Sequence, residues 1–109
     1  MNELVYFEHP KYGLVYVAIM SLQTGELCYE AVSVIQALGF INPDRTLNEL
    51  CMGRTRFLNN DRRVIVIPES DVLRLVSHST SQYAELFGRW LLEDVKQHVQ
   101  ASIRQQLLF

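Results

Sequence analysis

An apolar stripe near the C-terminus restricts the folds that this chain can adopt. Six apolar residues follow one another at intervals of three or four positions, namely Ala84, Phe87, Leu91, Val95, Val99 and Ile103. This spacing predicts one helix of about five turns with a continuous apolar face. Leu86 and Trp90 widen that face, and we expect Phe87 and Trp90 to pack in the core.

The beginning of the chain shows the pattern of strands instead. Residues 3–7, 14–20 and 27–30 are rich in β-branched and aromatic side chains, and turn-forming residues separate them. This order is typical of an antiparallel meander. A further, buried strand is predicted at residues 64–67, which are all Val or Ile.

Short helices are predicted between these strands and after them. One is capped near Ser33 and ends at Gly39, and a second is capped by Asn42 or Asp44. A third, led by Glu69 or Ser70, covers residues 71–76 with acids such as Asp71 at its positive N-terminal end, whereas the polar residues 53–63 read as a loop. Together the elements predict an α+β fold, in which a small antiparallel sheet packs with several helices and a long C-terminal helix.

Length and composition indicate a single domain over residues 1–109. The chain has 109 residues, of which 49% are hydrophobic and 20% charged, and this is enough for one core. No apolar run is long enough to cross a membrane, and no secretory signal is recognisable. Cys28 and Cys51 have no partner motif, which favours free thiols in a reducing compartment. We therefore expect a soluble protein of the bacterial or host-cell cytoplasm.

The positive charge of the chain is concentrated in its centre. The formal net charge is −2, yet residues 45–63 carry five arginines against Glu49 and Asp61. These arginines are Arg45, Arg54, Arg56, Arg62 and Arg63. Arginine-rich loops bind phosphates or the carboxylates of a protein partner. The alternative is a solvated loop whose charge offsets the acidic first third of the chain.

Residue types used in catalysis are present without the spacing that catalysis needs. Ser77 and His78 are neighbours, but no nucleophile turn surrounds them, and a loop between two helices explains them better. The histidines and cysteines lack the spacing of metal ligands, and no glycine-rich phosphate-binding motif occurs. We expect no enzyme, no catalytic residue, no metal and no cofactor.

Two segments carry short motifs in a fixed order. Residues 26–43 contain a short aromatic strand, a helix that ends in Leu-Gly-Phe, and then Asn-Pro. Residues 66–75 contain Val-Ile-Pro-Glu-Ser-Asp before a helix with an Arg-Leu pair, and five further positions follow, namely Ser79, Ala84, Phe87, Trp90 and Val95. This combination, over roughly residues 14–99, resembles the Bro-N domain, the N-terminal module of phage antirepressors and of baculovirus repeated-ORF proteins.

The chain departs from the family pattern at two places. Ser33 stands where the family usually places Asp at the start of its first helix, and either side chain can cap a helix. The family's last helix commonly ends in Val-Leu-Pro, whereas Lys96 and Gln97 follow Val95 here. We therefore expect residues 96–109 to extend the last helix beyond the family core.

The resemblance implies a regulator of a phage or prophage. Phage antirepressors bind the lysogenic repressor and remove it from its operator, whereas other members of the wider family are thought to bind DNA. The acidic balance of this chain favours a repressor-like protein partner of phage or host over DNA. Sequence-selective DNA binding remains the alternative, and no membrane partner is expected.

The end of the chain suggests self-association. The stripe continues further than a core of this size is expected to cover, and three apolar residues end the chain. We predict a homo-oligomer, most simply a two-fold dimer, through Val99, Ile103, Leu107, Leu108 and Phe109. In the opposing interpretation, the tail folds back onto the strands of its own chain.

Overall fold

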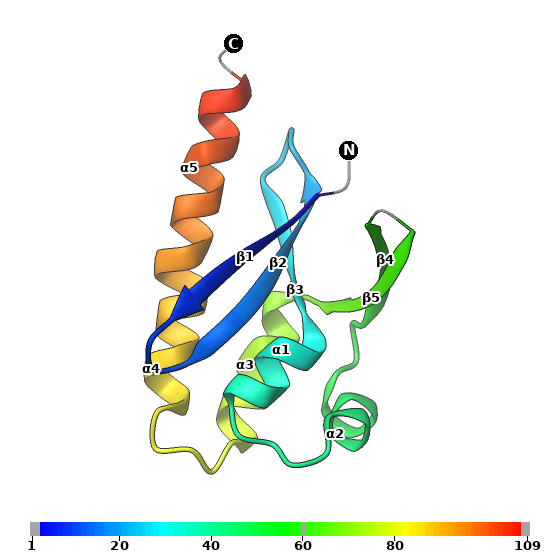
Figure 1. The fold of residues 1–109 in the computed structure, drawn as a ribbon, viewed down its shortest axis with the longest axis vertical. Coiled ribbons are helices and arrows are strands. Elements are labelled where there is room, and N and C mark those ends of the chain that lie inside the picture. Colours follow the sequence, from blue (N-terminus) through cyan, green and yellow to red (C-terminus); the bar gives the residue numbers. More distant parts are fainter. Residues whose placement is uncertain (1–2, 60, 108–109) are drawn as a thin grey trace.

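The computed structural model describes residues 3–59 and 61–107. Over these residues a five-stranded antiparallel sheet, in the order β1-β2-β3-β5-β4, packs against helices, with the last helix along one side (Figure 1). The predicted α+β class and the long C-terminal helix are therefore confirmed.

The predicted meander is present. Strands β1 (Glu3–His9), β2 (Gly13–Ser21) and β3 (Glu26–Glu30) pair in sequence order. In this register Val17 of β2 lies between Val5 of β1 and Tyr29 of β3. Directly opposed residues share one face of a sheet, so these side chains face the helices together.

Helix α1 (Ala31–Ala37) begins earlier than expected, and its cap is different. Glu30 caps it, because its carboxylate accepts hydrogen bonds from the backbone N–H groups of Val32, at 2.6 Å, and Ser33, at 3.1 Å. Ser33 lies inside the first turn, where its hydroxyl donates to the carbonyl oxygen of Glu30. Helix α2 (Pro43–Leu50) is capped by Asn42, one of the two predicted caps.

The prediction of a loop over residues 53–63 was wrong for most of that segment. Strand β4 (Thr55–Asn59) and strand β5 (Arg62–Ile67) pair as an antiparallel hairpin, in which Phe57 lies opposite Val64. The outer strand β4 is one edge of the sheet. The sequence pattern of β4 is weak because its two apolar residues, Phe57 and Leu58, are adjacent and point to opposite faces, and its other residues are polar.

The second half of the chain is helical after β5. Helix α3 (Glu69–His78) follows Pro68, and a continuous helical run then extends from Ala84 to Leu107. This run consists of α4 (Ala84–Arg89), a π-helical segment η1 (Trp90–Val95) and α5 (Lys96–Leu107). The Nε2 atom of Gln100 donates a hydrogen bond of 3.1 Å to the carbonyl of Gly25, which ties α5 to the β2–β3 turn.

Apolar side chains gather on both faces of the sheet. The larger cluster lies between the sheet and all the helices, and includes Tyr29, Leu75 and Leu91. The smaller cluster lies on the other face, where Phe57 and Val66 of the hairpin pack with Ala18 of β2.

Trp90 is less buried than expected. Phe87 is 1% exposed and belongs to the core, as predicted. Trp90 is only partly buried and packs at the margin of the main cluster. Its ring contacts His9, at the end of β1, and Tyr12 of the β1–β2 turn, with centroid distances of 5.2 and 5.7 Å. Part of the indole therefore faces solvent.

Candidate functional site

Helix α2 forms one wall of the candidate site. Asn42 caps the helix by accepting a hydrogen bond of 3.1 Å from a backbone N–H of the first turn. Thr46 and Leu47 are buried against the domain. Asp44 and Asn48, which are four positions apart, therefore lie together on an exposed side of the helix.

A buried carboxylate holds the segment that follows α2. Asp71 of α3 is 1% exposed, and its two oxygens accept hydrogen bonds from the backbone N–H groups of Met52, at 3.2 Å, and Gly53, at 2.8 Å. Arg74 lies 3.3 Å from Asp71 and also donates to the carbonyl of Leu50 at 3.2 Å. The chain between α2 and β4 is thus fixed by two side chains of α3.

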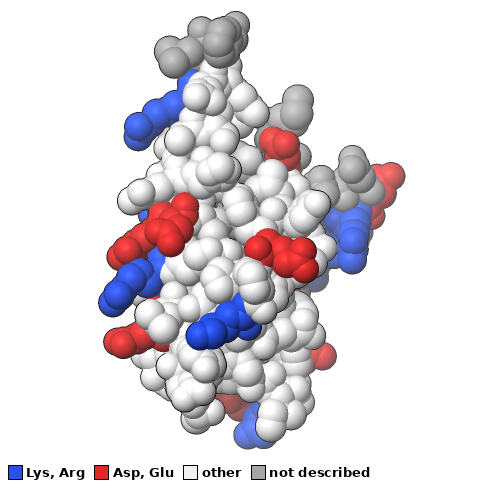
Figure 2. All heavy atoms as spheres, turned by 60° about the vertical axis from the view of Figure 1, so that its left-hand side comes forward, with Lys and Arg blue, Asp and Glu red and all other residues white. Residues whose placement is uncertain are grey.

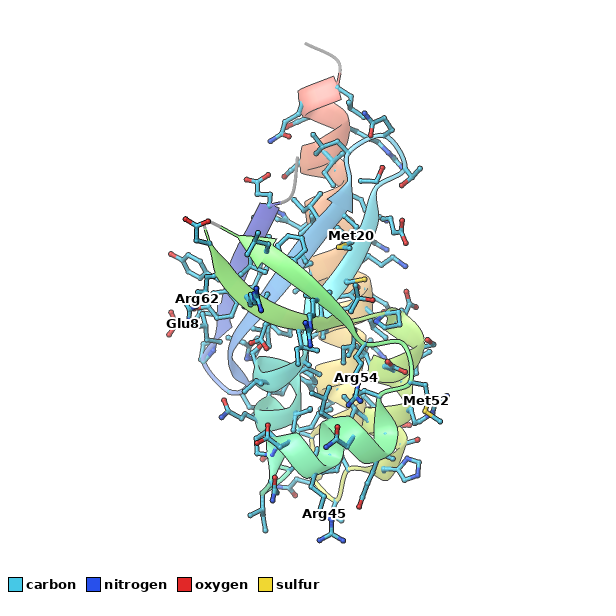
Figure 3. The ribbon with its side chains drawn as sticks, turned by 90° about the vertical axis from the view of Figure 1, so that its right-hand side faces the viewer. Glu8, Met20, Arg45, Met52, Arg54 and Arg62 are labelled. Carbon is cyan, nitrogen blue, oxygen red and sulfur yellow. The ribbon has the colours of Figure 1, made fainter. Side chains whose placement is uncertain are left out.

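Gly53 allows this segment to pass close to Pro68. A Cβ atom at position 53 would lie 2.8 Å from the Cγ of Pro68, which is closer than real Cβ atoms approach. The next residue, Arg54, projects between α2 and the hairpin (Figure 3). Its Nη1 donates a short hydrogen bond to Oδ1 of Asn48. Arg54 therefore has a defined position beside α2.

The β4–β5 register decides where the arginines of the hairpin point. Arg56 lies opposite Ile65, and Leu58 lies opposite Arg63. Alternate residues of a strand share a face, so Arg56 and Arg63 lie on the same side of the hairpin. That side is the one turned toward α2, since Arg56 and Ile65 line a hollow together with residues of α2.

The remaining two arginines lie elsewhere. By the same register Arg62 belongs to the face that carries Phe57, so it points away from Arg63. Arg45 extends from α2 away from the hairpin (Figure 3), and its Nε lies 3.0 Å from Oε1 of Glu49. This hydrogen bond raises the pKa of Arg45, which stays charged. The five predicted arginines therefore do not form one cluster.

Arg54 and Arg56 line a hollow of about 590 Å³ between α2 and the hairpin, which we call the arginine groove. Leu47 and Ile65 supply apolar surface to it. Asp44 is the one acidic residue among those that line it. The arginine groove thus combines two guanidinium groups with apolar surface and one carboxylate.

The arginine groove is suited to bind a planar anion. Guanidinium groups donate paired hydrogen bonds to carboxylates and phosphates. Arg56 and Arg63 form no ion pair or side-chain hydrogen bond with any residue that the structure describes. Their donors are therefore available to a ligand or partner, whereas Arg54 would share its donors with Asn48.

The cysteines contribute no reactive group to this site. Cys51 ends α2 and is buried, and burial together with the nearby charge of Asp71 raises its pKa to about 11. Burial also raises the pKa of Cys28, which is partly exposed. Both residues are free, uncharged thiols at neutral pH.

The residues predicted for an oligomer interface lie in different environments. Val99 is 4% exposed and Ile103 is 3% exposed, and both belong to the main core of their own chain. The expectation that this part of the stripe lacks cover within the chain was therefore wrong. Leu107 is 53% exposed. Leu108 and Phe109 lie outside the described residues, so the dimer itself stays a prediction.

Ser77 and His78 are the last two residues of helix α3. Both side chains lie near the carbonyl oxygen of Arg74, with Ser77 Oγ at 2.8 Å and His78 Nδ1 at 2.9 Å. Within residues 3–59 and 61–107, no group of three or more His, Cys, Asp or Glu side chains is arranged to hold a metal ion. No helix in this part of the chain is both long and apolar enough to cross a membrane.

Sequence reasoning missed three residues of this site. It treated Asp71 as an acidic residue at a helix N-terminus, although an acid beside the apolar Val72 and Leu75 already suggested a buried role. Asp44 was considered only as a cap, and Asn48 was not considered. Their four-residue spacing was the available signal that they share one side of a helix.

Comparison with protein families identifies the chain. The model of the N-terminal domain of the BRO family matches residues 17–97, close to the range of the resemblance described above. Comparisons with curated proteins and with solved structures give no significant match. The family match includes α2, the hairpin and α3, and hence all of the arginine groove. The chain belongs to the BRO family and carries its N-terminal domain, Bro-N.

Proposed function

We propose that this domain is a phage or prophage regulator that binds an acidic surface of a protein partner, such as a lysogenic repressor, and thereby alters transcription. The observation that carries the proposal is the arginine groove, in which Arg54 and Arg56 line one hollow beside α2. Membership of the BRO family supports a regulatory role. In this proposal the domain acts in the cytoplasm by binding, without catalysis and without a cofactor.

The charge distribution favours a protein partner over DNA. The net charge of the chain is −2, whereas a protein that binds DNA through phosphate contacts usually presents a basic surface. Asp44 lines the arginine groove and would repel a phosphate backbone. A phosphate backbone would bring several neighbouring negative charges past Asp44, whereas a single carboxylate of a protein partner brings one.

Capture of partners from lysates tests the proposal. The baits are the wild-type domain, the variant Arg54→Glu/Arg56→Glu, and Arg89→Glu as a control that reverses an exposed arginine outside the groove. We expect wild type and the control to capture the same protein after nuclease treatment, and the double variant to lose it. Equal capture by all three baits would exclude the arginine groove as the binding site.

One observation favours DNA binding as a second candidate, and the sequence-selective form of it is the alternative kept open above. Arg56 and Arg63 lie diagonally across the same face of the hairpin, so their Cα atoms are about 7–8 Å apart by sheet geometry. A hairpin that carries two arginines beside a helix would be able to contact neighbouring phosphates. A mobility-shift assay on genomic fragments at two salt concentrations tests this candidate. Sub-micromolar, sequence-selective binding at physiological salt would place DNA ahead of a protein partner.

A further inference from the structure

A second hollow, of about 300 Å³, lies on the side of the molecule away from the β4–β5 hairpin. Its lining residues come from the edge strand β1 and the long helix, the two elements that meet on the left of Figure 1. Its lining consists of Phe7, Glu8, Trp90, Asp94, Val95 and His98. We call this hollow the aromatic pocket. The pocket shares no residue with the arginine groove, so it is a separate site.

Aromatic rings form much of the wall of this pocket. Phe7 and His98 meet edge to face, with ring centroids 5.9 Å apart and planes at 90°. The indole of Trp90 is held from behind by His9, at 5.2 Å, and by Phe87, at 6.0 Å. Because these contacts fix the indole while part of it stays exposed, the aromatic pocket presents an ordered aromatic surface.

One carboxylate accompanies the rings. Asp94 stands one helical turn after Trp90 and one turn before His98, since each is four positions from the next. Glu8 of β1 also lines the pocket, but Phe7 beside it faces the helices, so by strand alternation the carboxylate of Glu8 points to the other face of the sheet. Within the described part of the chain, neither carboxylate takes part in an ion pair or a side-chain hydrogen bond.

Two lysines near this side of the molecule are engaged elsewhere. The ammonium group of Lys11 lies over the ring of Tyr83, 4.1 Å from its centroid. Lys96 pairs with Glu69 at 2.6 Å between Nζ and Oε2. On this side of the molecule, Figure 2 shows acidic and basic side chains close to one another, surrounded by uncharged surface. Among the described residues, Asp94 forms no ion pair with either lysine or with the exposed Arg89, so its charge is available to a ligand.

The helix is irregular where it lines the pocket. Trp90 and Asp94 both belong to the π-helical segment η1, and the regular helices α4 and α5 adjoin it. π-helical segments are rare and occur frequently at functional sites. This irregularity is a second observation, independent of the charges, that indicates a binding role.

We propose that the aromatic pocket binds a positively charged side chain, arginine or lysine, of a protein partner. Cations bind favourably over aromatic faces, and the carboxylate of Asp94 provides the opposite charge. The volume of about 300 Å³ suits one side chain rather than a helix or a strand. This site would act independently of the arginine groove, and through both sites the domain would bind one acidic and one basic protein surface.

The fluorescence of Trp90 tests this proposal, because Trp90 is the one tryptophan of the chain. The probe is the peptide acetyl-Gly-Arg-Gly-amide, and the comparison peptide has glutamine in place of arginine. At low salt we expect the arginine peptide to change the fluorescence saturably at millimolar concentrations, and the glutamine peptide to leave it unchanged. Raising the salt should weaken binding, since it rests on charge.

Matched variants distinguish a specific site from general attraction. We expect Asp94→Asn to weaken binding of the arginine peptide at least about fivefold, and Glu8→Gln, whose carboxylate points to the other face of the sheet, to weaken it by much less. Glu85→Gln removes an exposed acid that does not line the pocket, and it should leave the affinity unchanged. The proposal fails if both peptides change the fluorescence equally, or if Asp94→Asn binds as well as wild type.

A second copy of the chain is the rival occupant, because the hairpin carries exposed arginines. Light scattering of the protein with and without the arginine peptide distinguishes the two. Self-association that the peptide disrupts and Asp94→Asn abolishes would overturn the assignment to a separate partner. Peptide binding by a protein that stays monomeric would support it.

Discussion

At the scale of single residues, Asp71 has the largest influence on the candidate site. It is fully buried, and it satisfies two backbone N–H groups of the segment that leads from α2 to the hairpin. A buried carboxylate needs such partners, because unpaired buried charge is strongly destabilising. Asp71 therefore fixes the backbone just before Arg54 and the hairpin. It does so without contacting a binding partner itself.

Replacement of Asp71 tests this role. Asp71→Asn removes the charge and at least one acceptor, and we expect it to lower the free energy of unfolding by about 1–3 kcal/mol. Urea denaturation measures the change. Asp94→Asn is the control, because it makes the same substitution at an exposed carboxylate and should change stability by less than about 0.5 kcal/mol. Equal effects of the two variants would show that the contacts of Asp71 do not hold the domain together.

Cys51 gives a prediction for the dependence of stability on pH. Its pKa is raised from 9.0 to about 11 in the folded chain, so the unfolded chain loses the thiol proton at lower pH than the folded chain does. Its contribution to stability is complete below pH 9 and is lost as the pH rises toward 11. Chemical denaturation between pH 8 and 11 should show a smaller decline in Cys51→Ala than in wild type. Identical declines would contradict the assignment to Cys51.

At the scale of elements, the sequence predicts helices and strands whose apolar residues repeat at a regular spacing. It does not predict a strand that is defined by its pairing with another strand. The helical stripe and the first strands are each visible in a few consecutive residues, because their periods are local. The hairpin is different. Its strand β4 buries Phe57, which packs against the distant Ala18. The side of the hairpin on which Arg62 and Arg63 lie depends on that long-range packing. The sequence alone could therefore not show which of the arginines share a groove.

Neighbouring positions of β4 test the hairpin directly. Phe57 is 2% exposed and Leu58, on the opposite face, is 54% exposed. We expect Phe57→Ala to lower the free energy of unfolding by about 3–5 kcal/mol and Leu58→Ala to change it by less than about 0.5 kcal/mol. Urea denaturation of both variants measures the difference. Two similar, small effects would mean that residues 55–59 behave as a solvated loop.

At the scale of the whole molecule, two surfaces of opposite charge face different directions. The molecule measures 44 × 28 × 22 Å, and the long helix and the β4–β5 hairpin lie on opposite sides of it (Figure 1). The arginine groove adjoins the hairpin, and the aromatic pocket adjoins the long helix. The charge segregation was visible in the sequence, whereas the pocket was not, because its residues come from opposite ends of the chain.

The predicted dimer now depends on the very end of the long helix. Val99 and Ile103 are buried within the subunit, so truncation after Gln97 would remove core residues and is a poor test. Leu107→Asp is better, since Leu107 is half exposed. If a two-fold dimer forms through this end, the variant should be monomeric by light scattering at tens of micromolar, with unchanged thermal stability per subunit. A wild-type protein that is already monomeric at that concentration would exclude the dimer.

The central claim is that the arginine groove binds carboxylates of a protein partner. The most direct test is equilibrium binding of a captured partner to wild type, Arg54→Glu/Arg56→Glu and Arg89→Glu, with and without excess duplex DNA. We predict that the double variant binds at least about 100-fold more weakly, which corresponds to about 3 kcal/mol, and that DNA does not compete. Displacement of the partner by DNA, or equal affinity of the double variant and the Arg89→Glu control, would contradict the account.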